Sequence, residues 1–456
     1  MSRAENNQIK TNGPPPRGDG SLPKSQPRGF LISVYKGSQK SVCEEHLAEL
    51  ALLAKTFGVE VIGQVPCLVR KFEASTFVTE GKLAELVRQA KELGAELVIF
   101  DDEISPSQQR NLEKAFGVAV IDRTELILEV FAQRAQTKEA RLQIKLAQTK
   151  YEAPRLKRLW THLSRQAGTA GGSSGAGGGG GGYTKGEGEK QIEIDRRILK
   201  RQIDALQKEL EDVRHIRSTQ RQAIQRSDLP IFSIIGYTNA GKSTLLKALT
   251  EADVLIEDKL FATLDTTTRK FMLSNNQEIL LIDTVGFIRK LPHLLVAAFK
   301  STLEEAIQAD ILLHIVDVSH PMAEEQIETT YEVLKELGAQ HKPMITVLNK
   351  IDQCPDQSLI HKLRLKYEKT VPISATNRLG FDALEEMMIL ELSKQRRSVK
   401  LRIPQSQFGA VSEIIRLGNL ISQDYEENDV ILEVDLPVAI AEKYKRYAEK
   451  SLKSKG

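Results

Sequence analysis

Residues Gly236-Tyr-Thr-Asn-Ala-Gly-Lys-Ser243 fit the pattern G-x-x-x-x-G-K-S/T at every fixed position. An apolar stretch at 231–235 precedes them and predicts a buried strand, and residues 244–250 predict a helix. Glycines in such a loop let the backbone turn tightly and present its N–H groups to phosphate oxygens at the start of the helix. The pattern therefore predicts a phosphate loop whose nucleotide-binding residues are Gly236, Tyr237, Thr238, Asn239, Ala240, Gly241, Lys242 and Ser243.

Two further segments are expected to surround the phosphates. Lys242 should reach the β and γ phosphates, and the Ser243 hydroxyl should bind Mg²⁺. The segment Asp283-Thr284-Val285-Gly286 follows an apolar strand, so that Asp283 can hold Mg²⁺ through water and the Gly286 N–H can meet the γ-phosphate. A loop hydroxyl that senses the γ-phosphate is expected in Phe261-Ala262-Thr263-Leu264-Asp265. We assign it to Thr263, with Thr266, Thr267 and Thr268 as competing candidates.

The segment Asn349-Lys350-Ile351-Asp352, which follows the apolar strand 344–348, predicts which purine base the nucleotide carries. A carboxylate such as Asp352 accepts hydrogen bonds from the N1–H and 2-amino group of guanine, and adenine offers neither. Asn349 is expected to brace the loop and Lys350 to cover the base. Ser374, Ala375 and Thr376 follow another strand, and their backbone can approach the guanine oxygen. Together these motifs predict a domain that binds and hydrolyses GTP.

Phe287, directly after Gly286, is apolar and cannot orient an attacking water. Hydrolysis by the isolated protein is therefore expected to be slow. Asn239 resembles the asparagine of GTPases that bind K⁺ where others use an arginine finger, although an asparagine also suits a tight turn. The candidate catalytic residues are accordingly Lys242, Thr263, Gly286 and Asn239.

Composition limits which partners, compartments and membrane associations are expected for this protein. The chain has 456 residues and a formal net charge of +3, so a nucleic-acid surface would have to be a local patch. Cys43, Cys67 and Cys354 show no metal-ligand spacing and suit a reducing compartment. No apolar run is long enough to span a bilayer. We expect a cytoplasmic, monomeric protein.

The fold class predicted is a multidomain α/β protein. A disordered tail (1–28) precedes an N-terminal α/β domain (29–123), an antiparallel helical hairpin (124–227) with a Gly-rich loop (168–188), the P-loop GTPase domain (228–397) and a small α+β domain (398–456). In the last, strands are expected at 401–403 and 430–435, and helices at 412–417 and 437–450.

Alternating strands and helices in 29–122 predict a parallel sheet covered by helices. Strands are expected at 30–35, 59–62, 96–100 and 118–121, and helices at 44–56, 81–93 and 105–116. Ser105 should cap the third helix, with Pro106 in its first turn. Asp101-Asp102 ends a strand, and an exposed loop pair is favoured there over a metal site.

The hairpin is predicted from two long helical patterns. The first runs over 124–166 and is interrupted at Pro154, and the second runs over 191–226 with apolar residues at 192, 199, 206 and 213. A homodimeric coiled coil is the alternative. The segment 155–165 combines Arg155 and other basic residues with Trp160, which suits either RNA contact or a solvated helix face. The Gly-rich loop is expected to be slack in the free protein.

Beyond these motifs, the chain from 29 to 450 resembles the HflX family of ribosome-associated GTPases. The resemblance rests on long segments as well as the phosphate loop and the Phe261–Asp265 loop: Phe100–Lys114, Val120–Arg123, Phe131–Arg134, Arg158–Gln166, Gln191–Arg197 and Asp283–Arg289. It implies Ser243 and Thr263 as Mg²⁺ ligands. It also implies binding to the large ribosomal subunit and its ribosomal RNA, activation of hydrolysis by the ribosome, and the splitting of stalled or idle ribosomes.

Two segments depart from the family form. The usual Gly-Pro-Gly-Glu-Thr-Gln stands here as Gly186-Glu-Gly-Glu-Lys-Gln191, and Thr79-Glu-Gly-Lys82 does not predict a second nucleotide site. Two other functions remain open at this point. One is an assembly factor for the large subunit, and the other is a nucleotide-switched scaffold associated with RNA or peripherally with a membrane.

Overall fold

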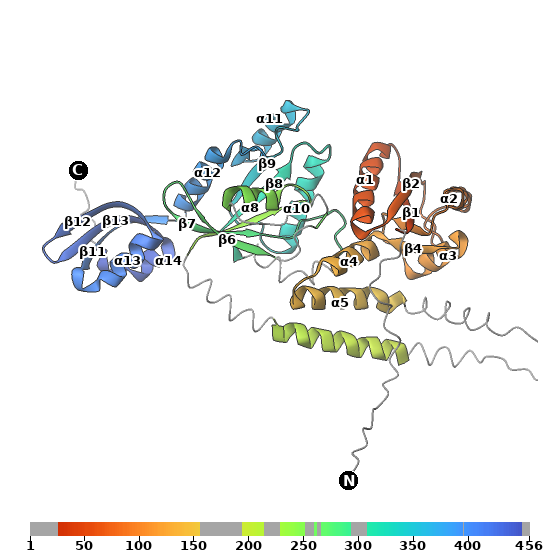
Figure 1. The fold of residues 1–456 in the computed structure, drawn as a ribbon, viewed down its shortest axis with the longest axis horizontal. Coiled ribbons are helices and arrows are strands. Elements are labelled where there is room, and N and C mark those ends of the chain that lie inside the picture. Colours follow the sequence, from red (N-terminus) through yellow and green to blue (C-terminus); the bar gives the residue numbers. More distant parts are fainter. Residues whose placement is uncertain are drawn as a thin grey trace, which may run out of the picture.

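The computed structural model describes residues 26–155, 194–213, 229–250, 260–261, 266–292, 308–394 and 396–448. Three sheets of four, six and three strands follow one another along the chain. Figure 1 shows them in a row, with the six-stranded sheet in the middle and the C-terminal sheet at the end far from the N-terminal one. The multidomain α/β fold expected from the sequence is confirmed. None of the helices in the described part of the chain has both the length and the apolar character needed to cross a bilayer.

The N-terminal sheet is parallel with strand order β2-β1-β3-β4. α1 packs on one face through Leu47 and Leu50, and α2 and α3 pack on the other through Leu86 and Leu112. Ser105 caps α3 in a capping box with Gln108, as expected. The elements are β1 Arg28–Tyr35, α1 Lys40–Phe57, β2 Glu60–Leu68, α2 Glu80–Glu92, β3 Leu97–Phe100, α3 Pro106–Phe116 and β4 Ala119–Asp122.

The first long helix of the hairpin is broken, which corrects the continuous pattern expected from 124 to Pro154. α4 spans Arg123–Arg134 and α5 spans Lys138–Glu152, followed by a 3-10 turn, Ala153–Arg155, at the proline. The chain leaves the helix at Ala135, and Thr137 begins a new one by accepting a hydrogen bond from Ala140 N. Most of the basic segment (156–165) and the Gly-rich loop lie outside the described residues.

Arg155 is not available to RNA, contrary to one of the two readings left open for the basic segment. Its side chain is only 8% exposed, and Nη2 donates to Ile104 O at 2.8 Å and lies 3.4 Å from Asp122 Oδ2. Its Nε donates to the side chain of Gln109. A buried guanidinium requires partners for its donors, and Arg155 finds them in the N-terminal domain. Arg155 thus connects the end of the first hairpin helix to that domain.

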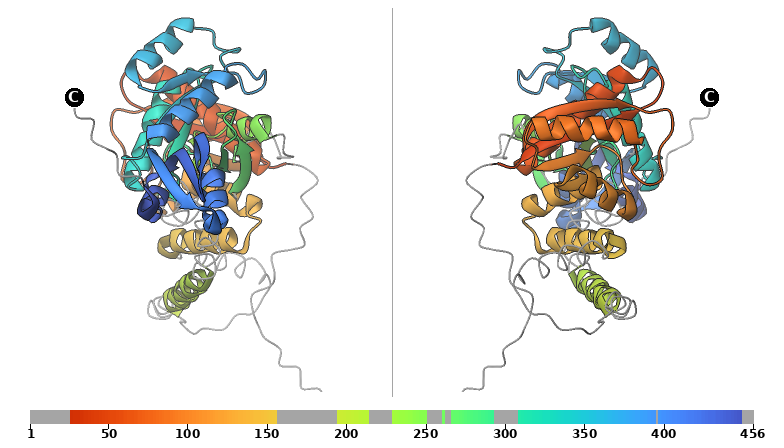
Figure 2. Two further views of the ribbon diagram at one scale, coloured as in Figure 1. Left: turned by 90° about the vertical axis from the view of Figure 1, so that its left-hand side faces the viewer. Right: turned by 90° about the vertical axis from the view of Figure 1, so that its right-hand side faces the viewer.

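Residues 194–213 form a helix beside α5, and Lys138 at the start of α5 pairs with Glu209 near its end. Figures 1 and 2 show the two helices side by side, running below the N-terminal and central sheets. The pairing is antiparallel, as the sequence predicted, and Leu210 of the apolar seam is buried.

The central sheet has the order β10-β9-β8-β5-β7-β6, and β6 alone among these strands is antiparallel. β6 was missed because its sequence, Thr267-Thr-Arg-Lys-Phe-Met272, does not alternate apolar and polar residues. Two of the competing switch threonines, Thr267 and Thr268, belong to this strand. The elements are β5 Ile231–Gly236, α8 Lys242–Thr250, β6 Thr267–Met272, β7 Glu278–Asp283, β8 Ile311–Asp317, α10 Ala323–Glu336, β9 Met344–Asn349, α11 Gln357–Lys366, β10 Thr370–Pro372 and α12 Phe381–Lys394.

The C-terminal sheet is antiparallel with order β11-β13-β12 and is covered by α13 and α14 on one face. Its edge strand β12 was missed, because its polar sequence shows no clear alternation. The helix expected over 437–450 is also wrong in extent, since Pro437 ends β13 and α14 stops before Tyr444. The elements are β11 Arg396–Pro404, a 3-10 turn Gln405–Gln407, α13 Phe408–Leu417, β12 Asn419–Glu426, β13 Asp429–Pro437, α14 Val438–Lys443 and a 3-10 turn Lys445–Tyr447.

Candidate nucleotide-binding site

The phosphate loop joins the carboxyl end of β5 to the start of α8, at the edge of the sheet where ligands of parallel α/β sheets bind. Gly236 has φ +143°, and a Cβ there would lie 2.3 Å from Ile315 O. Gly241 has φ +97°, and its Cβ would lie 2.2 Å from Asn349 Nδ2. Both positions therefore require glycine, for backbone conformation and for space.

Lys242 lies at the base of the loop and is buried. Its Nζ donates to Tyr237 O at 2.7 Å, which curls the side chain back over the loop. Burial lowers the pKa of Lys242 to about 8, although the charge of Asp283 opposes this change. Beside it, Ser243 Oγ donates to Asp283 Oδ2 at 2.6 Å, so that the end of β7 meets the start of α8.

Asn349 ties three loops together at the other end of the site. Its Nδ2 donates to Ala240 O at 2.8 Å, and its Oδ1 accepts from Ala375 N at 3.0 Å. The phosphate loop, the 349–352 turn and the 374–376 loop are thereby held side by side, as the three motifs required. Asp352 is exposed on this turn, where a ligand can reach it.

Lys350 continues the turn with φ +63°, and its Nζ lies 2.6 Å from Asp317 Oδ2. Asp317 ends β8, next to both β5 and β9, and was not singled out from the sequence. Its place directly after an apolar strand was the signal that could have identified it. Of the predicted site residues, Ala262, Thr263, Leu264 and Asp265 lie outside the described residues.

The side chain of Phe287 is buried and carries no polar atom. Its backbone pairs with the phosphate loop, since Phe287 N donates to Gly236 O at 3.0 Å and Thr238 N donates to Phe287 O at 2.7 Å. Three residues before Phe287, Thr284 Oγ1 donates to Ile234 O at 2.7 Å and holds the start of this segment against β5. The 283–287 segment therefore lies directly against the phosphate loop.

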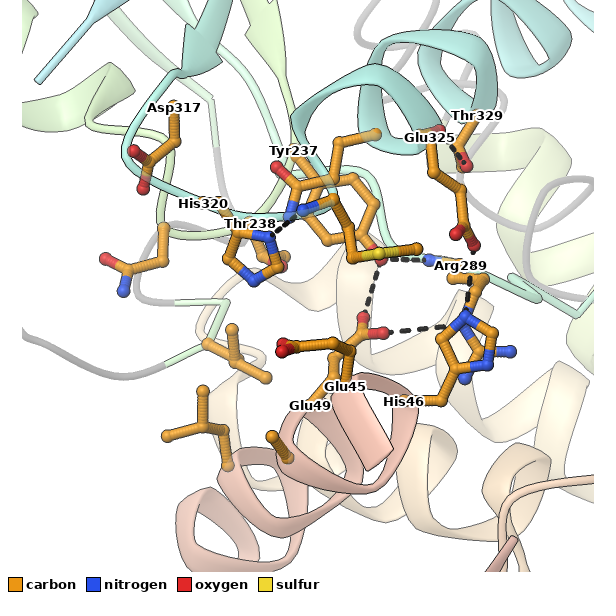
Figure 3. Close-up of a pocket in the computed structure, with 16 residues that line it drawn as sticks. Glu45, His46, Glu49, Tyr237, Thr238, Arg289, Asp317, His320, Glu325 and Thr329 are labelled. Carbon is orange, nitrogen blue, oxygen red and sulfur yellow. Dashed lines mark hydrogen bonds and ion pairs between the residues drawn. The ribbon is translucent and has the colours of Figure 1, made fainter. Parts of the chain in front are cut away.

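A charged network joins this site to the N-terminal domain, and sequence reasoning missed it. Tyr237, in the phosphate loop, donates its hydroxyl to Glu49 of α1 at 2.7 Å and accepts from Arg289 N at 2.8 Å. Figure 3 shows Glu49 reaching from α1 toward Tyr237, with Arg289 beside both. These residues, with His46, Asp317 and His320 among others, line a pocket between α1 and the central domain.

Asp101 is the centre of this network, which corrects the exposed loop pair expected at Asp101-Asp102. Its side chain is completely buried and lies within 2.9 Å of Arg123 Nη1 and 2.8 Å of Arg289 Nη2. Lys290 contacts both Asp101 and Asp102. Burial by itself would raise the pKa of Asp101, but the three cations outweigh it and lower the pKa to about 2. The arrangement neutralises a buried carboxylate with cations from two domains.

Three family models match consecutive parts of the chain. The family described as GTP-binding GTPase N-terminal matches residues 44–132, the GTP-binding GTPase Middle Region matches 134–223, and the family described as 50S ribosome-binding GTPase matches 231–350. Among solved structures, a GTP-binding protein from Sulfolobus solfataricus in complex with GDP covers 81% of this chain and 99% of its own, at 25% identity and a TM-score of 0.42.

Curated relatives match along nearly the whole chain. GTPase HflX of Chlamydia pneumoniae is 47% identical over 92% of this chain and 88% of its own length. GTPase HflX of Escherichia coli is 40% identical over 90% of this chain and 94% of its own. The phosphate loop and the Asn349–Asp352 turn are held together by Asn349, in a chain that matches these relatives over about nine tenths of its length. The protein belongs to the HflX family of GTPases, and its reaction is the hydrolysis of GTP.

Proposed function

We propose that the protein binds the large ribosomal subunit and uses GTP to dissociate stalled or idle ribosomes. The observation that carries this proposal is that the similarity extends beyond the GTPase domain, through the N-terminal and middle regions. A nucleotide switch needs only the central domain, so two further matched regions ahead of it point to a large partner. The description of the matched central family as a 50S ribosome-binding GTPase supports a ribosomal partner.

The nucleotide lies along the loops that Asn349 holds together. Lys242 contacts the β and γ phosphates, the Gly286 N–H donates to the γ-phosphate, and Asp352 accepts from guanine. Mg²⁺ fits the donor set of Ser243 and Asp283, because a hydroxyl and a carboxylate already meet there at 2.6 Å. Ser243 and Thr263 would ligate it, and the ion would neutralise charge on the phosphates.

Hydrolysis by the protein alone is slow, because the buried Phe287 cannot position water. Asn239, with φ +61°, lies in the loop beside the interdomain pocket and is the candidate ligand for K⁺. Turnover should therefore fall when Na⁺ replaces K⁺ at constant ionic strength, and should rise on addition of large subunits. Equal turnover in the two salts would remove the K⁺ part of the proposal and leave the remainder intact.

The decisive experiment is sedimentation of ribosomes with the full-length protein and a non-hydrolysable GTP analogue. The proposal predicts loss of intact ribosomes and movement of the protein into the large-subunit fraction. Lys242→Ala, which removes the phosphate contact, should abolish both effects. Association with precursor particles would instead indicate an assembly factor, and no association with any ribosomal fraction would indicate the scaffold function.

A further inference from the structure

The strand β12 forms one edge of the C-terminal sheet, which Figure 1 shows at the far end of the row of domains. It pairs with β13 on one side, and no strand in the described part of the chain pairs with its other side. An edge strand offers a row of backbone N–H and C=O groups to another chain, and proteins often protect it with lysine, proline or a bulge. β12 has a bulge between Leu420 and Ser422 but no lysine or proline, and Ser422–Glu426 pairs regularly with β13. This part of the edge is open to a further strand.

One side of β12 carries apolar groups that the domain leaves uncovered. Leu420 and Tyr425 lie opposite Val434 and Val430 of β13, so they point to the side of the sheet on which α13 packs. The core on that side joins α13 and α14 to β11 and β13, and among the described residues it includes none from β12. Leu420 is accordingly 37% exposed and Tyr425 is 61% exposed. A strand added at this edge would reduce the exposure of both side chains.

The other side of β12 is acidic. The Ser422 hydroxyl donates to Glu433 of β13 at 3.4 Å, and Asp424 and Glu426 follow at alternate positions on the same side of the strand. The hairpin of β12 and β13 contains six acidic residues and no lysine or arginine. Arg402 of β11 pairs with Glu426, whereas Asp424 pairs with no cation in the described part of the chain. The open edge therefore has an apolar side and a negatively charged side.

This distribution of charge favours one kind of occupant. A second copy of β12 would bring its own carboxylates to these carboxylates, and RNA would bring phosphates, so both would be repelled. The end of the chain itself begins at the opposite edge of the sheet, because Ala448 forms a bridge with Leu401 of β11. A cationic protein segment is attracted, and its backbone can use the unpaired groups of the strand.

We propose that the edge of β12 binds an extended, lysine- or arginine-rich segment of a partner protein, which adds a fourth strand to the C-terminal sheet. Backbone hydrogen bonds supply the affinity, and alternate side chains supply the specificity. Apolar residues of the segment pack on Leu420 and Tyr425, and the residues between them place cations beside Asp424 and Glu426. Basic arms of this kind occur in proteins that bind nucleic acid, so the large subunit of the proposed function offers candidates.

The test measures binding of a short fluorescein-labelled peptide of alternating lysine and valine to the full-length protein by fluorescence anisotropy. A second peptide has the same composition with its lysines and valines in separate blocks, so that it keeps the charge but loses the alternation. The alternating peptide should bind about tenfold more tightly, because only this peptide places all its valines on one side of a strand. Its affinity should fall as salt is added.

Variants of exposed residues test each side of the edge. Asp424→Lys combined with Glu426→Lys should weaken binding of the alternating peptide about tenfold, because attractive cross-strand pairs become repulsive. The same variant should gain affinity for a peptide of alternating glutamate and valine. Tyr425→Ser removes an apolar contact outside the core and should weaken the lysine peptide about fivefold. The matched control, Glu332→Lys with Glu336→Lys on α10, makes the same change in net charge and should bind as the parent does.

The inference is overturned if the parent binds the alternating and block peptides with affinities within about twofold of each other, or if the charge-reversed variant keeps the affinity of the parent. A parent dimer in sedimentation equilibrium that Tyr425→Ser dissociates would identify a second copy as the occupant and would also overturn it. The peptide assay contains neither ribosomes nor nucleotide. Its failure therefore leaves the proposed ribosomal function standing, and failure of the ribosome experiment leaves this binding edge standing.

Discussion

Replacing Asn349 with alanine should lower both the stability of the central domain and its affinity for GDP. The side chain is 2% exposed and makes two hydrogen bonds, to Ala240 O and from Ala375 N. Alanine removes both partners and leaves a backbone acceptor and a backbone donor unpaired in the interior. It also leaves space beside Gly241, whose backbone now lies against the Asn349 amide.

The sizes of the expected losses of stability and of GDP affinity follow from these two hydrogen bonds. An unsatisfied buried polar group costs about 1–3 kcal/mol, so leaving both groups unpaired destabilises the domain by about 2–6 kcal/mol. The phosphate loop and the 374–376 loop are positioned by the same amide. A loss of only about 2 kcal/mol in positioning would weaken GDP binding about 30-fold.

Fluorescence titration with labelled GDP measures the affinity, and urea denaturation measures the stability. Asp352→Ala is the matched variant, because this side chain lies on the same turn but is exposed. It should lose GDP affinity while its stability stays within about 0.5 kcal/mol of the parent. Asn349→Ala should lose both properties.

If Asn349→Ala binds GDP within threefold of the parent and unfolds at the same urea concentration, the two hydrogen bonds do not hold the loops together. A loss of stability without a loss of affinity would show that the bonds support the fold but do not position the nucleotide.

Three further outcomes are expected. His314 in β8 is buried, and burial together with the charge of Lys242 lowers its pKa to about 3. Below about pH 6.5 the unfolded state binds a proton at this side chain that the folded state excludes, so the free energy of unfolding of the parent should fall by about 2 kcal/mol between pH 7.5 and pH 5. In denaturation experiments at the two pH values, the fall for His314→Leu should be smaller by that amount. Arg155→Met leaves the buried Asp122 without its guanidinium partner and should cost about 3–5 kcal/mol of stability in urea denaturation. Gly286→Ala places a Cβ against the phosphate loop and displaces a γ-phosphate donor, so single-turnover hydrolysis should fall about 10²-fold while GDP affinity changes little.

The central domain was predictable because its chemistry follows its strands. Gly236, Asp283 and Asn349 each end an apolar strand, and parallel strands bring such ends to one edge of the sheet. The Ser105 cap was predictable for a similar reason, since capping depends on residues three positions apart. Local signals of this kind need no knowledge of distant parts of the chain.

Edge strands and helix breaks were harder to predict. β6 and β12 lie at the edges of their sheets, where one side of the strand has no neighbour and the sequence need not alternate. The break after α4 depends on Thr137, a threonine in a polar run that resembles an ordinary helix surface. Propensity alone does not distinguish a capping threonine from an exposed one within a helix.

The interdomain network could not be predicted from local pattern at all. Asp101 and Arg289 are separated by 188 positions, and the sequence around each gives no sign of the other. Their burial follows only from the way the N-terminal sheet docks, with the carboxyl end of β3 facing residues 289 and 290. A charged pair at a strand end can therefore indicate a domain contact as readily as a ligand site.

The same network limits what an excised central domain can show about this GTPase. Cutting before residue 229 would remove Glu49, Asp101 and Arg123, and would leave the Tyr237 hydroxyl and the Arg289 guanidinium without their partners from the N-terminal domain. Residues 287–290 would then be held by the phosphate loop alone, and the neighbouring Gly286 could adjust to a γ-phosphate at a lower cost in free energy. Such a fragment should bind the GTP analogue more tightly relative to GDP than the whole protein does. If both forms show the same affinity ratio in calorimetry, the N-terminal domain has no influence on the nucleotide site through this contact.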